Sequence, residues 1–322
     1  MQTILVTGGA GFIGSHLVNT LLLKRDSKVI VLDNFDPFYD PSIKRENILP
    51  FASSPHFQLV EGDILNRGIV EEVISTFKPG VIIHLAALAG VRPSLKDPVR
   101  YWMVNLVGTT HLLEVAISQG VQHFVFGSSS SVYGNISKVP FSESDSADVP
   151  LSPYAATKRA GELLCSTYNQ IYSLPMTVLR FFTVYGPSQR PEMAIHKFTR
   201  MIEEGTPIPL YGDGGMLRDY TYVDDIVSGI IASIDRPTPG LEIYNLGNSQ
   251  PVALRDLVQM IESSLGKPAK IENLPEQPGD VQITFADIQK ARWNLGFEPR
   301  VGIQEGIGRF VAWFRKKNAG KH

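Results

Sequence analysis

The stretch TGGAGFIG, residues 7–14, decides the fold of this chain. It follows TILV at residues 3–6, an apolar run typical of a buried strand, and it opens an apolar run of helical character. Gly8, Gly11 and Gly14 permit a tight turn, a close approach of the main chain to a pyrophosphate, and tight packing of helix on strand. Strand, glycine turn and helix in this order predict a dinucleotide-binding unit.

The distribution of acidic residues around this turn indicates which dinucleotide binds. No Asp or Glu occurs from Val6 to Lys24, so the positive end of the helix dipole is left for an anion. A second predicted strand, residues 28–33, ends in Asp33, which follows Gly14 by 19 residues. That spacing is typical of a carboxylate that binds the ribose diol of a dinucleotide. Because a carboxylate repels a 2′-phosphate, the sequence favours NAD over NADP.

A second informative stretch is SPYAATK, residues 152–158. Ser152 is suited to cap a helix and Pro153 to occupy its first position, so a helix is predicted to begin here. Tyr154 and Lys158 then share one helix face and can reach the same small molecule. An ammonium beside a phenol favours the phenolate, so the pair is a candidate general base.

Composition restricts the class of protein. The chain has 322 residues, of which 43% are hydrophobic, enough for a large core and two lobes. A formal net charge of −2 provides no general attraction to nucleic acid or to an anionic membrane. A single cysteine, Cys165, suits a reducing compartment, and no apolar run reaches the roughly 18 residues of a membrane span. We expect a cytoplasmic protein without a secretory leader.

Strand-like and helix-like segments alternate through the first half of the chain. This pattern predicts a doubly wound α/β fold with a parallel sheet and helices on both faces. The predicted strands are residues 3–6, 28–33, 57–61, 81–85, 123–128 and 177–182, and the predicted helices are residues 11–24, 66–77, 98–119 and 153–172. Ligands of such sheets bind at the carboxyl ends of the strands, so functional residues should follow each strand.

Prolines interrupt this alternation beyond residue 183. There, predicted helices at residues 192–204, 223–235, 253–264 and 302–316 alternate with short strands. We therefore expect a Rossmann domain at residues 1–180 and a smaller substrate-binding lobe at residues 181–322, with the strand at residues 243–246 returning to the large sheet. The Pro- and aromatic-rich loop at residues 35–41 either borders the adenosine or is a surface loop without function, and the sequence leaves both interpretations open.

Together these features resemble the extended short-chain dehydrogenase/reductase family, in its nucleotide-sugar epimerase and dehydratase branch. The resemblance covers essentially the whole chain. Further motifs that carry it are Asp63-Ile64, His84 to Ala87, Asn105, Ser128 to Gly134, Arg218 to Asp224 and Asn245 to Asn248. It implies a large lobe that binds NAD, a smaller lobe that binds a nucleotide diphosphate-sugar, and a homodimer formed through the helices at residues 98–119 and 153–172.

The resemblance also assigns roles to residues. Tyr154 is the catalytic base, Lys158 holds the nicotinamide ribose and lowers the pKa of the phenol, and Ser129 bonds the reacting hydroxyl. The residues expected to bind NAD are Gly8, Gly11, Phe12, Ile13, Gly14, Asp33, Asn34, Asp63, Ile64, Leu85, Ala86, Ala87, Asn105, Ser128, Tyr154 and Lys158. The residues expected to bind the sugar nucleotide are Arg92, Ser129, Ser130, Ser131, Thr183, Arg190, Lys197 and Arg218.

The segment at residues 129–134 indicates which of the reactions known in this branch to expect. Dehydratases of this branch carry an acid pair just after the catalytic Thr, and decarboxylases carry a Glu just before the Val-Tyr-Gly. Here the segment reads SSSVYG, without a carboxylate at either place. Oxidation of a ring carbon by NAD should then be followed by return of the hydride to the other face of the ketone. The expected reaction is epimerisation, at C4, with NAD recycled.

The substrate is indicated by fewer residues. Thr183 stands where UDP-galactose 4-epimerases carry Asn, and Gln277 stands where they carry Arg, so the chain resembles the group that acts on UDP-glucuronate. A substrate carboxylate needs hydroxyl and cationic partners, and the candidates are Ser130, Ser131, Thr183 and Arg190. A UDP-glucose/UDP-galactose 4-epimerase and a one-way nucleotide-sugar reductase or dehydrogenase remain as alternatives. A nucleotide-sensing protein without turnover is the rival of another class.

The remaining charged residues have weaker signals. Arg218 is the candidate ligand of the pyrophosphate, and its alternative is a surface salt bridge to Asp219 or Asp224. Arg92 could face either the sugar or solvent. His84 ends a predicted buried strand and is expected to be a packed core residue. The histidines show no mutual ligand spacing, so no metal site is predicted.

Overall fold

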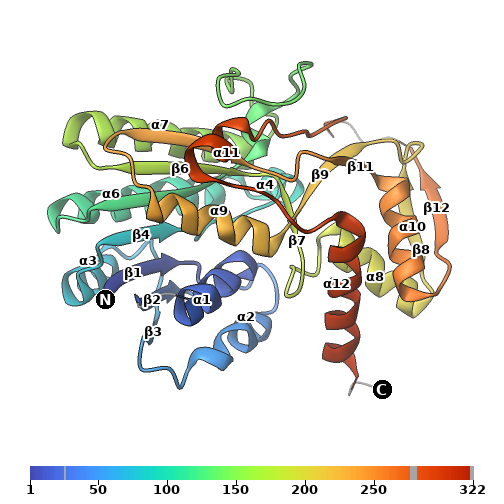
Figure 1. Cartoon of the computed structure of the whole chain (residues 1–322), viewed down its shortest axis with the longest axis horizontal. Coiled ribbons are helices and arrows are strands. Elements are labelled where there is room, and N and C mark those ends of the chain that lie inside the picture. Colours follow the sequence, from blue (N-terminus) through green and yellow to red (C-terminus); the bar gives the residue numbers. More distant parts are fainter. Residues whose placement is uncertain (25–26, 276–280, 320–322) are drawn as a thin grey trace.

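The computed structural model describes residues 1–24, 27–275 and 281–319. Its centre is a seven-stranded sheet in which all neighbouring strands run parallel (Figure 1). Across the sheet the strands lie in the order β10 (Leu241–Leu246), β6 (Met176–Phe181), β5 (His123–Ser129), β4 (Val81–His84), β1 (Gln2–Thr7), β2 (Ser27–Asp33) and β3 (Phe57–Glu61). The order reverses between β1 and β4, which is where a doubly wound sheet binds its ligands.

Alternation of side chains along each strand creates two cores. In β1, the buried residues Ile4 and Val6 belong to one hydrophobic cluster, whereas Leu5 between them belongs to the other. Successive side chains of a strand point to opposite faces, so both faces of this sheet must be covered. The predicted doubly wound parallel sheet is confirmed.

Helices cover both faces of the sheet. Residues of α3 (Arg67–Phe77), α6 (Gly108–Ser118) and α7 (Pro153–Tyr172) form the cluster that contains Leu5. Residues of α1 (Phe12–Lys24), α9 (Val223–Asp235) and α11 (Gln289–Leu295) form the cluster on the other face. The short helix α11 was not predicted, because seven residues provide too little of a periodic pattern to recognise.

The prediction of one helix at residues 98–119 was only partly right. The segment contains α5 (Pro98–Trp102), a π-helical turn η2 (Met103–Val107) and then α6. Asn105 lies inside the π turn, with its side chain directed to the loop after β4. π-bulges of this kind are frequent at functional sites, and they re-aim a side chain in a way that periodicity does not reveal.

The connection after β2 contains a helix that was not predicted. Residues 34–40 form a loop, and α2 (Pro41–Ile48) follows, continued by the 3₁₀ turn η1 (Leu49–Phe51). Asp40 caps α2 by accepting a hydrogen bond from the Ser42 N–H at 2.9 Å. Two further short elements lie beside the cleft, α4 (Val91–Lys96) after β4 and the 3₁₀ turn η3 (Ser130–Tyr133) after β5.

The second lobe lies beyond one end of the sheet (Figure 1). Its helices are α8 (Ala194–Glu204), α10 (Leu254–Leu265) and α12 (Ile303–Asn318), and its strands form a parallel pair, β8 (Pro207–Tyr211) with β12 (Lys270–Leu274), and a three-stranded sheet, β7 (Thr183–Tyr185), β9 (Leu217–Tyr222) and β11 (Pro251–Ala253). These helices match the predicted ones to within a few residues at each end, as expected for helix boundaries.

The chain returns to the large sheet after entering the second lobe. Strand β10 pairs in parallel with β6, with Ile243 opposite Val178, which confirms the predicted return of residues 243–246. Helix α9 packs against α1 on the sheet. The division of the chain at residue 180 stays a prediction. Within the described residues, no helix combines the length and the apolar character needed to cross a bilayer.

Candidate active site

A cleft of about 800 Å³ lies at the carboxyl ends of the strands, between the sheet and the second lobe. All residues predicted to bind NAD or the sugar nucleotide line this cleft, with the exception of Asn105. Segments from both halves of the chain meet there, including the turn at residues 8–14 and the residues Arg190 and Arg218. The residues chosen separately from the sequence therefore belong to one site.

The glycine turn forms a cradle that a single added carbon would fill. Gly8 has a φ of +71°, and a Cβ there would lie 2.7 Å from the Ala86 nitrogen. A Cβ on Gly14 would lie 2.3 Å from the Gly8 carbonyl oxygen. The turn is closed by hydrogen bonds from the Gly8 N–H to the Leu32 carbonyl, at 2.9 Å, and from the Gly11 N–H to the Gly8 carbonyl, at 3.1 Å. A bare main chain at a helix N-terminus without acidic residues fits a pyrophosphate.

Asp33 lies at the end of β2 with its carboxylate held in place. Its oxygens accept hydrogen bonds from the Ala10 N–H at 3.1 Å and the Phe35 N–H at 2.9 Å. Burial raises the pKa of Asp33, and the charge of Lys44 opposes that shift. A carboxylate oxygen has capacity for a second donor, so Asp33 can still accept from a ribose hydroxyl.

Lys44 is a residue of the cleft that sequence reasoning missed. Its amine donates to the Asp36 carbonyl oxygen at 3.0 Å and lies 4.9 Å from the centre of the Tyr39 ring. Burial lowers the pKa of Lys44, and the charges of Asp33 and Asp36 oppose the shift. The loop at residues 35–41, whose role was open, contributes Asp36, Phe38 and Tyr39 to the cleft lining.

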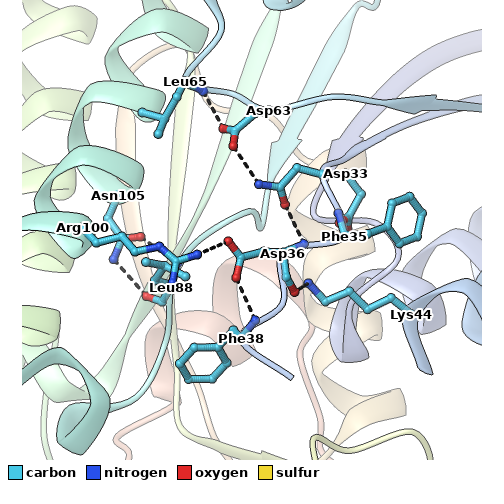
Figure 2. A network of polar contacts seen from close by, with 11 residues as sticks. Asp33, Phe35, Asp36, Phe38, Lys44, Asp63, Leu65, Leu88, Arg100 and Asn105 are labelled. Atoms are coloured by element: carbon cyan, nitrogen blue, oxygen red, sulfur yellow. Dashed lines mark hydrogen bonds and ion pairs between the residues drawn. The ribbon is translucent and has the colours of Figure 1, made fainter. Parts of the chain in front are cut away.

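A polar network links the strand ends at this side of the cleft (Figure 2). The Asn34 amide donates to the Asp63 carboxylate at 2.8 Å and so joins the ends of β2 and β3. The carboxylate of Asp36 accepts from Arg100 of α5 and from the Phe38 N–H. Three segments distant in sequence are thereby joined around the predicted adenosine end.

Asn105 lies outside the cleft lining and contacts the loop after β4 instead. Its carboxamide oxygen accepts from the Leu88 N–H at 2.9 Å, and its NH₂ donates to the Leu88 carbonyl at 3.0 Å (Figure 2). The NH₂ also donates to the Thr157 hydroxyl at 3.0 Å. The side chain is 2% exposed. In this structure Asn105 therefore positions the main chain that lines the cleft, and its predicted contact with NAD stays a prediction.

The catalytic candidates come from β5 and α7. Ser152 caps α7 by accepting a hydrogen bond from the Ala155 N–H at 3.1 Å, as predicted. Ser129 ends β5, and its hydroxyl accepts from the Ser131 N–H at 3.2 Å. Burial raises the pKa of Tyr154, whereas a hydrogen bond to Ser129 and the charge of Arg190 lower it. The arrangement thus contains groups that favour the phenolate against the effect of burial.

Lys158 lies one helical turn after Tyr154 and is buried. Its amine donates to the Gly127 carbonyl at 2.7 Å and lies 5.1 Å from the centre of the Phe126 ring. Burial lowers the pKa of Lys158 to about 8, while Glu162 and Cys165 raise it. An amine that titrates close to neutral pH in a cleft is typical of a functional group.

A second aromatic residue positions Tyr154. The Tyr101 ring packs edge to face against it, with ring centres 6.3 Å apart and an interplanar angle of 82°. The Tyr101 hydroxyl donates to the Ala89 carbonyl at 2.8 Å. Sequence reasoning did not select Tyr101, because no motif includes it and only the tertiary fold brings the two rings together.

Arg190 is a cation that lines the cleft together with Ser129, Tyr154 and Lys158. Its guanidinium lies 5.7 Å from the centre of the Phe38 ring and 3.3 Å from the Glu192 carboxylate. Its charge lowers the pKa of Tyr154, and both residues line the same cleft. Thr183, at the start of β7, also lines the cleft.

Arg218 and Arg92 line the cleft from opposite lobes. Of the two residues named above as alternative partners of Arg218, Asp219 is fully buried and accepts the N–H groups of Asn248 and Ser249, and Asp224 lies 3.7 Å from His16 and 3.8 Å from Arg309. Arg92, from the large lobe, lies 5.3 Å from the ring centre of Tyr211 in the second lobe. Both guanidinium groups are therefore placed to bind an anionic or polar ligand.

His84 is a buried core residue, as predicted. Its ring nitrogens pair with Thr7 at 2.7 Å and with Thr109 at 2.8 Å, and burial lowers its pKa to about 3. It is therefore neutral at physiological pH. Among the described residues, no three His, Cys, Asp or Glu side chains converge as a metal site would require.

Comparison with known proteins places this site in a family. The model of the NAD-dependent epimerase/dehydratase family matches residues 4–247. The chain belongs to this family. A UDP-glucuronate 4-epimerase from Thermodesulfobacterium geofontis is 43% identical over 317 residues, which are 98% of this chain and 97% of that protein.

Solved structures of the family share the whole fold. A UDP-glucuronic acid 4-epimerase from Bacillus cereus, crystallised with UDP-glucuronic acid and NAD, is 36% identical with a TM-score of 0.93, over 98% of this chain and 100% of that one. A UDP-glucose 4-epimerase from Thermotoga maritima, crystallised with UDP-glucose, is 34% identical with a TM-score of 0.90, over 98% of this chain and 99% of that one. Gln277, used above as evidence on the substrate, lies outside the described residues.

Proposed function

We propose that this member of the epimerase/dehydratase family inverts C4 of a UDP-sugar with bound NAD, and that it interconverts UDP-glucuronate and UDP-galacturonate. The observation that carries the proposal is the convergence of Ser129, Tyr154 and Lys158 with Arg190 in one cleft. The first three provide acid–base chemistry at a hydroxyl. The last provides a cation beside it for a carboxylate.

The chain's own residues carry out the proton transfer. Tyr154 takes the proton of the sugar's C4 hydroxyl, and Ser129 holds that oxygen by a hydrogen bond. The Lys158 ammonium stabilises the phenolate. Bound NAD would supply a hydride acceptor that also returns the hydride to C4, so no net oxidation would result. The main chain of the turn at residues 8–14 would hold its pyrophosphate, and Asp33 its adenosine ribose.

The distribution of carboxylates supports epimerisation over elimination. Of the residues described as lining the cleft, the carboxylates are Asp33, Asp36, Asp63 and Glu192. The first three follow β2 and β3, at the predicted adenosine end, and Glu192 contacts Arg190. Ser130 and Ser131 stand beside Ser129 where elimination needs an acid, so the ketone is reduced again.

Recognition of a substrate carboxylate also protects the intermediate. A ketone at C4 of glucuronate is a β-keto acid, which can lose CO₂ if its carboxylate is free to rotate. The cationic Arg190 and the hydroxyls of Thr183, Ser130 and Ser131 are placed to hold that carboxylate. This favours inversion of an acidic sugar without decarboxylation.

Proton NMR of the sugar's C4 position tests the proposal. The purified protein is incubated separately with UDP-glucuronate, UDP-glucose and UDP-N-acetylglucosamine. Inversion of UDP-glucuronate alone is the expected result. Deuterium placed at C4 should persist in the product, and its loss to solvent would contradict the mechanism.

UDP-glucose is the second candidate substrate, because the Thermotoga maritima enzyme is named for it and shares the fold of this chain. Inversion of UDP-glucose at a rate comparable with UDP-glucuronate would favour it. A one-way reductase or dehydrogenase would instead change the nicotinamide absorbance in proportion to product.

The surface of α5 and α7 supports a homodimer. Val99 and Trp102 of α5 and Leu163 and Ile171 of α7 are exposed hydrophobic side chains, although α5 and α7 are packed against each other. Exposed apolar residues gathered on neighbouring helices favour association of two copies. Light scattering at several concentrations should give twice the chain mass, and replacement of Ile171 by Glu should shift it to the monomer.

Cys165 supports placement in the cytoplasm. It is a free and fully buried thiol, and it is the single cysteine of the chain. A fold that depends on no disulfide suits a reducing compartment. Cell fractionation should recover the protein with cytoplasmic markers.

A further inference from the structure

A buried carboxylate lies on the same face of α7 as the catalytic pair. Glu162 follows Lys158 by four residues and Tyr154 by eight, and it is 2% exposed. One carboxylate oxygen accepts from the Ser128 hydroxyl at 2.6 Å and from Arg180 Nε at 2.9 Å. The other accepts from Arg180 Nη2 at 2.8 Å and from Arg159 at 3.1 Å.

These contacts connect the two elements that carry the catalytic residues. Ser128 immediately precedes Ser129 at the end of β5, whereas Glu162 belongs to α7, as do Tyr154 and Lys158. The hydrogen bond from Ser128 to Glu162 therefore fixes the distance between Ser129 and the pair on the helix. Arg180 extends the connection to β6, where its guanidinium is also buried.

Stability alone does not account for this arrangement. Removal of two charges from water costs several kcal/mol per ion in general, and apolar replacements of buried pairs are often neutral or stabilising. A buried pair directly beneath a catalytic centre is therefore better explained by what its charge and geometry do there.

The charged and titratable groups around Lys158 show what the charge does. On α7 these are Glu162 and the Cys165 thiol, whose pKa burial raises well above its ordinary value. On β4 it is His84, which is neutral. On β6 it is Arg180, whose charge is paired with Glu162. Tyr154, also on α7, is the group whose phenolate the ammonium stabilises, and Glu162 is the one carboxylate among these groups.

We propose that Glu162 is a positioning residue of the catalytic centre, which holds the end of β5 against α7 and provides the negative charge that keeps Lys158 an ammonium. The proposal rests on the proposed function in one respect, that catalysis needs the Lys158 ammonium beside Tyr154. Burial opposes that ammonium, since it lowers the pKa of Lys158 to about 8, and Glu162 counteracts the shift.

The test is the pH dependence of kcat/KM. Its alkaline limb reports loss of the Lys158 proton, so Glu162→Gln should move that limb to lower pH by about one unit. A merely structural role would lower kcat/KM uniformly and leave the limb in place. Arg159→Gln is the matched control, because Arg159 contacts the same carboxylate from the half-exposed surface and should leave the limb unmoved.

A double variant separates the charge effect from loss of the fold. Glu162→Gln leaves Arg180 buried without its carboxylate, which destabilises the protein. Glu162→Gln with Arg180→Gln removes both charges and should recover the thermal midpoint lost in the single variant. Because this double variant also removes a positive charge from the surroundings of Lys158, the alkaline limb is compared in the single variant, and a wild-type limb in Glu162→Gln would overturn the proposal.

A measurement without substrate distinguishes failure of this proposal from failure of the proposed function. Protein labelled with carbon-13 at the lysine Cε is titrated by NMR, and Lys158→Arg identifies the Lys158 resonance. The Lys158 midpoint should be lower in Glu162→Gln than in the wild type. Equal midpoints would overturn the role of Glu162, whatever sugar the wild type acts on.

Discussion

The two ends of the cleft are built in different ways. At the dinucleotide end, the part of the ligand surface that faces the pyrophosphate is main chain and glycine, and Gly8 and Gly14 approach other backbone atoms closely there. At the sugar end it is made of side chains, such as Thr183, Arg190 and Arg218, which reach into the cleft from beyond β6. The glycine turn does not tolerate an added side chain, whereas the sugar end can be altered one side chain at a time.

This difference divides specificity between the two lobes. The backbone cradle recognises what all dinucleotides share, and only Asp33 selects among them. The side chains of the other end decide which sugar is held over Tyr154. Substitutions at the two ends should therefore have different effects. At the glycine turn they should weaken binding of the cofactor, and at the sugar end they should alter selectivity among sugar nucleotides.

The largest effect is expected between the two ends, at Tyr154. Tyr154→Phe removes the hydroxyl that exchanges the proton and should lower kcat by about 10³-fold, within the range of general acid–base catalysis. NAD content should stay near the wild-type value, because the substitution removes one hydroxyl and leaves the glycine turn, Asp33 and Lys158 in place. Turnover followed by NMR, with NAD released and quantified after denaturation, checks both.

Tyr101→Phe is the matched control for that variant. It keeps the edge-to-face ring contact with Tyr154 and removes only the hydrogen bond to the Ala89 carbonyl. Its kcat should fall by tenfold or less, about the effect of one neutral hydrogen bond. Equal losses in the two variants would contradict a specific role of the Tyr154 hydroxyl in proton transfer.

The next largest effect is expected at the dinucleotide end. A Cβ on Gly14 would lie 2.3 Å from the Gly8 carbonyl oxygen, so Gly14→Ala must displace main chain, at a cost of about 1–3 kcal/mol. Titration of the protein with NAD should show affinity reduced by tenfold or more. Gly11→Ala, where the contact is 3.2 Å, should be affected less. The reverse order would contradict the cradle.

This end of the cleft was also the more predictable from sequence. The glycines, the helix without early acids and Asp33 lie within one βαβ unit, so their spacing in sequence fixes their spacing in space. Tyr154 and Lys158 were predictable for the same reason, since one helix turn separates them. In both cases local periodicity determines the geometry.

The parts that sequence reasoning missed depend on contacts between distant segments. Lys44 belongs to α2, a helix that was not predicted after the Pro- and aromatic-rich loop. Tyr101 of α5 contacts Tyr154 of α7, and no sequence motif links the two residues. The sequence does contain features from which Glu162 and Arg180 could have been selected. The carboxylate lies on the face of Tyr154 and Lys158, and the arginine interrupts the otherwise apolar strand MTVLRF.

At the sugar end, Arg190→Leu should change selectivity. Loss of the cationic partner of a substrate carboxylate costs about 2 kcal/mol, so kcat/KM for UDP-glucuronate should fall about thirtyfold. Any activity on UDP-glucose, which has no carboxylate, should fall less, because that substrate loses only the effect of the Arg190 charge on the pKa of Tyr154. Competition between the two sugar nucleotides measures the ratio. Unchanged kcat/KM for UDP-glucuronate would remove Arg190 from the site.

The smallest effect is expected at Arg100, whose side chain forms a contact at the dinucleotide end of the cleft. Arg100 pairs with Asp36 and joins α5 to the loop after β2, with side chains 43% and 16% exposed (Figure 2). Partly exposed pairs contribute about 0.2–1 kcal/mol, so Arg100→Gln should accelerate NAD dissociation only two- to fivefold. High salt should produce a similar acceleration in the wild type and little further change in the variant. A much larger acceleration would mean that this end, too, depends on side chains, and the contrast between the two halves of the cleft would then be wrong.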